Sequence, residues 1–104
     1  MTSYMIIHRL DRRYKMHRAG FEIMLVWAWP ASSNEFVAGH PWSECKRYKV
    51  IAERVFGLSY YEWVNDRGNW KWERNRRDKS GRPVIEERIY IRSEKHLTLF
   101  QMAL

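Results

Sequence analysis

The sequence contains little that would cross-link or interrupt the chain: among 104 residues there are one cysteine, three prolines and five glycines. The lone Cys45 excludes an internal disulfide and fits a reducing compartment. The few prolines and glycines form no linker, and the sequence holds no internal repeat and no low-complexity tract. These absences predict a single domain over residues 1–104.

Long hydrophobic runs are also missing. The most apolar stretch, Phe21–Pro30, is ten residues long, whereas a membrane-spanning helix needs about 20. The opening MTSYMIIHRLDRR has no basic region followed by a long apolar core, so it is not expected to be a signal peptide. We therefore expect a cytoplasmic protein without membrane association (host cytoplasm if a bacteriophage encodes it).

What the chain does contain is aromatic side chains. Six Trp and six Tyr raise the aromatic content to 15%, within a hydrophobic content of 45% that is normal for a globular core. These rings bury large areas, and their N–H and O–H groups need hydrogen-bond partners when they are inside. Some of them are therefore expected at the rim of the core or on the surface.

Phe21–Pro30 is the stretch around which we expect a sheet to form. A period of two places Phe21, Ile23, Leu25, Trp27 and Trp29 on one face of a strand. The other face, from Glu22 to Ala28, is also mostly apolar. A strand that is apolar on both faces belongs in the interior of a sheet.

The remaining elements follow from similar patterns. Strands are predicted at Tyr4–Leu10, Tyr60–Val64, Asn69–Arg74 and Val84–Arg92, the last with one solvated side and so an edge strand. Basic or polar loops are predicted at Asp11–Gly20, Ala31–Gly39 and Asn75–Pro83, with turns at Asn65–Gly68 and Asp78–Gly81. Strand pairing that extends into Tyr14 and Met16 is the alternative for the first loop.

Two helices are expected. The main one covers residues 41–56, because His40 and Pro41 are suited to its start, Glu44 to its first turn and Gly57 to its end. A short helix over residues 94–103 begins after Ser93, with a further strand as the competing prediction. The fold class is thus α+β, with a mostly antiparallel sheet of four to five strands.

The net charge of +7 lies in two segments. Residues 8–20 carry five Lys or Arg against one Asp, a net of +4, and residues 66–82 carry seven against three acids, also a net of +4. The rest of the chain sums to −1. This distribution indicates a basic surface built by two segments.

Basic side chains interleaved with aromatic rings are typical of nucleic-acid binding, since cations attract phosphates and rings stack on bases. We therefore predict a non-enzymatic domain without a cofactor that binds nucleic acid or an acidic protein surface. The residues predicted to bind are Arg9, Arg12, Arg13, Lys15, Arg18, Arg67, Trp70, Lys71, Trp72, Arg74, Arg76, Arg77, Lys79 and Arg82. The competing interpretation is that the Trp residues form the core and the charges form a solvated face.

Other constellations give little support for catalysis. Cys45 falls on the apolar face of the main helix, where a thiol is usually inert, although His40 is near. The four histidines show no zinc-ligand spacing. Glu86 and Glu87 point to opposite faces of a strand. Glu22 is expected to be paired or at the sheet rim, and a metal-dependent nuclease built on it is a further hypothesis.

Three features of the chain are its short length, the aromatic strand sequence NWKWERN and the ending RIYIRSEKHLTLFQMAL. In these features it resembles small orphan proteins encoded by bacteriophages. The resemblance assigns a role to no individual residue. It implies a protein that binds and inhibits a host complex, or an assembly subunit of the virion, with exposed Trp and Tyr as anchors.

Overall fold

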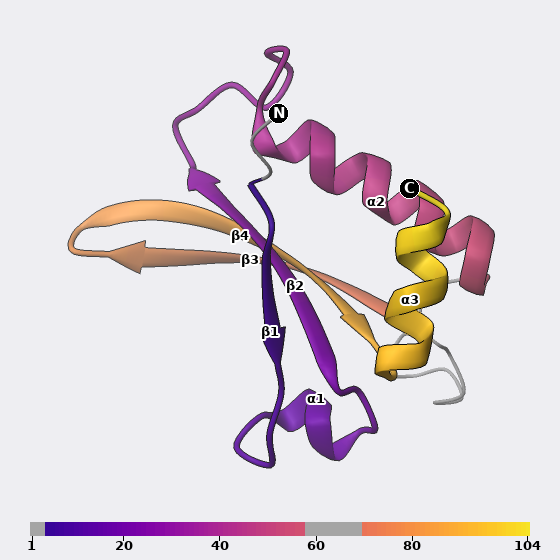
Figure 1. The fold of residues 1–104 in the computed structure, drawn as a ribbon. Coiled ribbons are helices and arrows are strands. Elements are labelled where there is room, and N and C mark those ends of the chain that lie inside the picture. Colours follow the sequence, from indigo (N-terminus) through magenta and orange to yellow (C-terminus); the bar gives the residue numbers. More distant parts are fainter. Residues whose placement is uncertain (1–3, 58–69) are drawn as a thin grey trace.

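The computed structural model describes residues 4–57 and 70–104, and within them the chain forms one four-stranded antiparallel sheet and three helices (Figure 1). The predicted α+β class, with one main helix and a short C-terminal helix, is confirmed. The strand expected at Tyr60–Val64 and the turn at Asn65–Gly68 lie outside the described residues, as do Trp63 and Arg67.

The strands are β1 (Ile6–Arg9), β2 (Ile23–Pro30), β3 (Trp70–Lys79) and β4 (Arg82–Ile91), in the spatial order β1-β2-β4-β3. The interior position predicted for the apolar stretch is confirmed, because β2 pairs with β1 on one side and β4 on the other. The prediction of an edge position for the Val84–Arg92 strand is wrong. β4 also lies inside the sheet, and its polar face is the face that the main helix does not cover.

The hairpin of β3 and β4 is longer than the sequence suggested. The predicted loop Asn75–Pro83 is mostly strand, since the pairing continues from Arg76 opposite Ile85 to Lys79 opposite Arg82. The turn is therefore Lys79–Arg82, one residue later than the predicted Asp78–Gly81 turn. Its two central residues, Ser80 and Gly81, have φ angles of 53° and 77°, as the favoured two-residue hairpin turns with two left-handed residues require.

The main helix, α2 (Pro41–Phe56), begins and ends where the sequence predicted. Nδ1 of His40 accepts a hydrogen bond of 3.0 Å from the backbone N–H of Trp42, and Gly57 ends the helix with a φ of 86°. The C-terminal segment is helix α3 (Glu94–Met102), capped by Ser93, so the competing prediction of a strand there is wrong.

The connection between β1 and β2 contains one turn of helix, α1 (Lys15–Arg18), where the sequence predicted a loop or a continued strand. The helix forms because Met16 can then be buried together with Leu10, Phe21, Met24 and Tyr90. Phe21 consequently packs in this small cluster. It does not join the core face that carries Ile23, where the period of two had placed it.

The two faces of the sheet are covered differently. Helices α2 and α3 lie together over one face (Figure 1), and the main core fills the space between them and the apolar side chains of β2, β3 and β4. On the other face, the part of the chain that the structure describes covers the sheet at one end, with the small cluster beneath α1. No helix in the described ranges is long and apolar enough to cross a membrane.

Candidate functional site

The sheet face that α2 and α3 leave uncovered carries a row of charged side chains, which we call the open face. On β3, Trp70 and Trp72 pack toward the helices, so the residues between and after them, Lys71, Glu73 and Arg77, point to the open face. On β4 the register places Arg88 opposite Glu73. The alternation along β3 thus places its Trp side chains on the helix side and these three charged side chains on the open face.

A polar network joins the open-face residues of β3 and β4. Arg88 forms an ion pair with Glu86 through Nε and donates a hydrogen bond of 3.1 Å to the phenol oxygen of Tyr90. The Tyr90 O–H in turn donates to Oε2 of Glu73 at 3.0 Å, and Nζ of Lys71 lies 3.9 Å from Oε1 of Glu73. Burial raises the pKa of the Tyr90 phenol, so this group stays protonated and serves as a donor at neutral pH.

A pocket of about 180 Å³ lies between α1 and this network. Its walls come from both of the basic segments that the sequence singled out. The lining residues are Tyr14, Lys15, Met16, Glu73, Arg88 and Tyr90. The first basic segment therefore meets the second at the open face through Glu73, which is the residue of the second segment in this lining.

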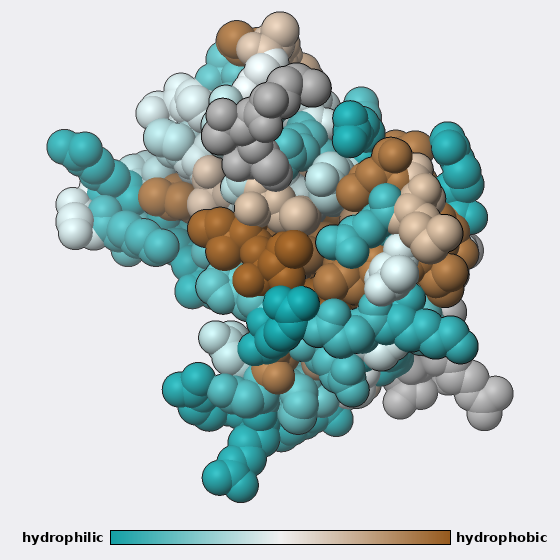
Figure 2. Space-filling view, in the orientation of Figure 1, coloured by the Kyte–Doolittle hydropathy of each residue, from teal (hydrophilic) through white to brown (hydrophobic). Residues whose placement is uncertain are grey.

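The far end of the β3–β4 hairpin carries most of the remaining exposed charge. β2 ends at Pro30, opposite Val84, so residues 79–82 extend past it. The exposed basic residues of this end are Arg76, Arg77, Lys79 and Arg82. Two described acids lie near them: Glu86, 4.0 Å from Arg77, and Asp78, which is exposed between Arg77 and Lys79 on β3. Figure 2 shows hydrophilic side chains concentrated on two projections, which are the hairpin end and the region of α1.

The two Trp residues predicted to bind bases face the helices. Trp70 is 3% exposed, and its indole N–H donates a hydrogen bond of 2.7 Å to the carbonyl of Gly57. Trp72 is half-buried, with Nζ of Lys49 at 4.1 Å from its ring centroid. Neither ring therefore belongs to the open face.

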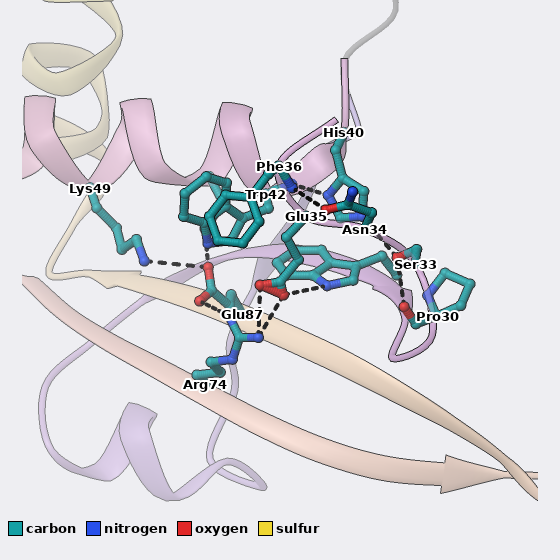
Figure 3. Close-up of polar contacts among 12 residues, drawn as sticks. Pro30, Ser33, Asn34, Glu35, Phe36, His40, Trp42, Lys49, Arg74 and Glu87 are labelled. Carbon is teal, nitrogen blue, oxygen red and sulfur yellow. Dashed lines mark hydrogen bonds and ion pairs between the residues drawn. The ribbon is translucent and has the colours of Figure 1, made fainter. Parts of the chain in front are cut away.

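Arg74 also points to the helix side, where it is held by acids (Figure 3). Its guanidinium lies 3.1 Å from Oε1 of Glu87 and 2.7 Å from Oε2 of Glu35. Glu87 is completely buried. Its Oε2 also accepts a hydrogen bond of 2.9 Å from the Cys45 thiol and lies 3.4 Å from Nζ of Lys49. This cluster neutralises itself and supports α2 on the sheet.

The first basic segment is partly neutralised as well. Arg9 pairs with Glu94 at the start of α3, and Arg13 pairs with Asp11 at 2.8 Å. Arg12, before α1, and Arg18, the last residue of α1, are exposed. Of the predicted binding residues, the structure therefore leaves Arg12, Lys15, Arg18, Arg76, Arg77, Lys79 and Arg82 exposed around the open face and the hairpin end.

The side chains considered for catalysis in the sequence analysis are not among the lining residues of the pocket on the open face. Burial raises the pKa of the Cys45 thiol, which makes it a poor nucleophile. His40 caps α2, and His96 lies 2.7 Å from Oγ of Ser93. Glu22, just before β2, is exposed. No group of three His, Cys, Asp or Glu side chains within residues 4–57 and 70–104 could hold a metal ion.

Sequence reasoning missed Tyr14, Glu73, Arg88 and Tyr90 as lining residues of one pocket. The alternation on β3 did place Glu73 on the face opposite the Trp residues. The pairing of Glu73 with Arg88, however, depends on a hairpin register that follows from the two-residue turn. In comparisons with known proteins, no protein family, no curated protein and no solved structure matches the chain.

Proposed function

We propose that this protein is a non-enzymatic binding domain whose exposed basic side chains contact an anionic partner, most simply nucleic acid. One observation carries the proposal. Arg74, in the middle of β3, is held by acids, whereas Arg76, Lys79 and Arg82, nearer the hairpin turn, have no ion pair with a described acid. Charge that is left in solvent at one place attracts a partner of opposite charge.

The shape of the basic region supports nucleic acid as that partner. The exposed charge follows the hairpin end and α1, which border the same uncovered sheet face (Figure 2). From Arg76 to Lys79 the exposed cations of β3 span about 10 Å, at about 3.4 Å per residue, and Arg82 lies across the turn from Lys79, so these side chains can contact neighbouring phosphates. A projecting two-stranded ribbon also has the size that the major groove of a duplex admits.

The test is binding of single-stranded and duplex oligonucleotides to the purified protein over a range of salt concentration. Contacts with phosphates release counterions, so the logarithm of the affinity falls linearly with the logarithm of the salt concentration. The proposal expects such a fall. Absence of binding at low salt, or an affinity that does not change with salt, would refute it.

A protein-binding assembly subunit is the second candidate, favoured by exposed apolar side chains. Phe36 is 85% exposed, Met102 79% and Ile6 57%, and such side chains anchor protein interfaces. The described Trp residues are buried or half-buried, so these side chains would replace the Trp anchors. Self-association that persists at high salt in sedimentation equilibrium, and that Met102→Ser weakens, is the expected result; a monomer at all concentrations would argue against it.

A further inference from the structure

The pocket beneath α1 combines a small volume with several hydrogen-bonding groups. Its volume of about 180 Å³ is below the roughly 300–1,000 Å³ of most small-molecule sites, so it has room for one ring system. The side chains of Glu73 and Arg88 are 28% and 17% exposed. Both therefore retain some contact with solvent at the pocket while the neighbouring network holds them in place.

These two side chains have hydrogen-bonding capacity left over. The bonds of Arg88 to Glu86 and Tyr90 use two of the five N–H donors of a guanidinium. The Tyr90 O–H fills one of about four acceptor positions on the Glu73 carboxylate, and Nζ of Lys71, at 3.9 Å from the other oxygen, forms an ion pair without a hydrogen bond. A ligand with N–H donors for the free acceptor positions of Glu73 and an acceptor for the remaining N–H groups of Arg88 would be bound by both side chains.

We propose that this pocket binds one unpaired base of a single-stranded nucleic acid, and that it prefers guanine. This inference rests on the proposed function and specifies which part of the partner is read. The hairpin end and α1 bind the backbone through their cations, and the pocket between them accepts the base.

Guanine follows from the chemistry of the two charged groups. Its Watson–Crick edge carries two adjacent N–H donors, N1–H and the N2 amino group, which match the two oxygens of the Glu73 carboxylate. The neighbouring O6 is an acceptor for the Arg88 guanidinium, as in other arginine–guanine contacts. A base in a duplex has this edge occupied, so the base must be unpaired. The side chains of Tyr14 and Met16 supply apolar wall, against which a ring can pack.

The first experiment uses the unaltered protein and three 12-mers of oligothymidine, in which one central position holds dT, dG or deoxyinosine. Deoxyinosine keeps O6 and N1–H of guanine and lacks the N2 amino group. The dG oligonucleotide should bind at least about 5-fold more tightly than the dT oligonucleotide, and deoxyinosine should lose much of that gain. Equal affinity for all three would overturn the base pocket while leaving the proposed function standing, whereas no salt-dependent binding of any of them would overturn both.

The second experiment uses Glu73→Gln, which keeps the shape of the side chain and an oxygen acceptor for Tyr90. The substitution raises the net charge by one unit, so electrostatics alone would strengthen binding to every oligonucleotide. The proposal expects the preference for dG to disappear. Glu53→Gln, at an exposed position on α2, makes the same change in charge and should retain the preference. A dG preference that survives in Glu73→Gln would contradict the assignment, and if that variant does not fold, the comparison with deoxyinosine still decides.

Discussion

Arg74 and Glu87 lie directly opposite each other on β3 and β4 and form an ion pair of 3.1 Å beneath α2. Glu87 is fully buried, whereas the Arg74 side chain is 37% exposed. The pair therefore joins the exposed, charged part of the hairpin to a carboxylate buried at the edge of the main core. A buried carboxylate is tolerated only when its partners are in place.

We expect Arg74→Ala to lower the free energy of unfolding by about 2–3 kcal/mol, because it removes a charged hydrogen-bond donor from the buried Glu87. Lys49 and Cys45 still contact the carboxylate, which keeps the loss below that of a completely unpaired buried charge. Urea unfolding monitored by Trp fluorescence measures the change. Arg76→Ala, on the same face of the same strand but without an ion pair to a described acid, is the matched control and should cost less than about 0.5 kcal/mol. Equal losses in the two variants would contradict a structural role for Arg74.

Glu35 makes part of this stability depend on pH. The hydrogen bonds from Arg74 hold the pKa of Glu35 below its ordinary value of 4.5. A carboxyl group with a lowered pKa in the folded state stabilises the protein above its ordinary pKa, and this contribution is lost as the pH falls through the folded value. We expect the urea midpoint to fall below about pH 4.5, and to fall less steeply in Glu35→Gln.

Asp11 supplies the control for this pH dependence. Its pKa is also lowered by hydrogen bonds with Arg13, but the pair is on the surface, with side-chain exposures of 80% for Arg13 and 49% for Asp11. Surface pairs contribute little, so Asp11→Asn should leave the pH profile close to that of the unaltered protein. If Asp11→Asn reduces the pH dependence of the urea midpoint more than Glu35→Gln does, the cluster beneath α2 is not the source of that dependence.

Cys45 should be unreactive in the folded protein. Its side chain is fully buried, and burial, together with the hydrogen bond to Glu87, raises the pKa of the thiol. Since the thiolate is the reactive form, a disulfide reagent at mildly alkaline pH should modify Cys45 only at the rate of unfolding. The rate should rise to that of a free thiol in denaturant. Immediate modification without denaturant would contradict the burial of this side chain.

The elements with clear physical signals could be predicted from the sequence. Helix α2 has a capping residue, Pro41 at its first position and Gly57 after its end, and its bounds match the prediction. β2 is apolar on both faces, which places it inside the sheet. In both cases the local sequence and the tertiary surroundings favour the same structure.

The polar half of the hairpin could not be predicted in the same way. The segment from Asn75 to Pro83 is rich in charge and in turn-forming residues, so its local pattern is that of a loop. It forms a strand because β4 provides a partner, and β3 is the outer strand among those described, a position that accepts charged side chains on both faces.

The candidate site was partly predictable. The exposed Lys and Arg residues follow from composition, and Lys15 does line the pocket. The prediction that Trp70 and Trp72 share a surface with the cations is wrong, because adjacent residues of a strand point to opposite faces. The contribution of Arg88 depends on cross-strand register, which the sequence alone does not specify.

The central claim is that the basic hairpin end contacts phosphates, and a comparison of salt dependence tests it most directly. Arg76→Ala with Lys79→Ala removes two exposed cations from the hairpin, and Arg54→Ala with Lys95→Ala removes two exposed cations from α2 and α3. Binding of a single-stranded oligonucleotide is measured from low to high salt. The hairpin variant should lower the slope of log affinity against log salt by up to about 1.4, at roughly 0.7 per lost phosphate contact, and the helix variant should leave it unchanged. Equal slopes in both variants and the unaltered protein would contradict the claim.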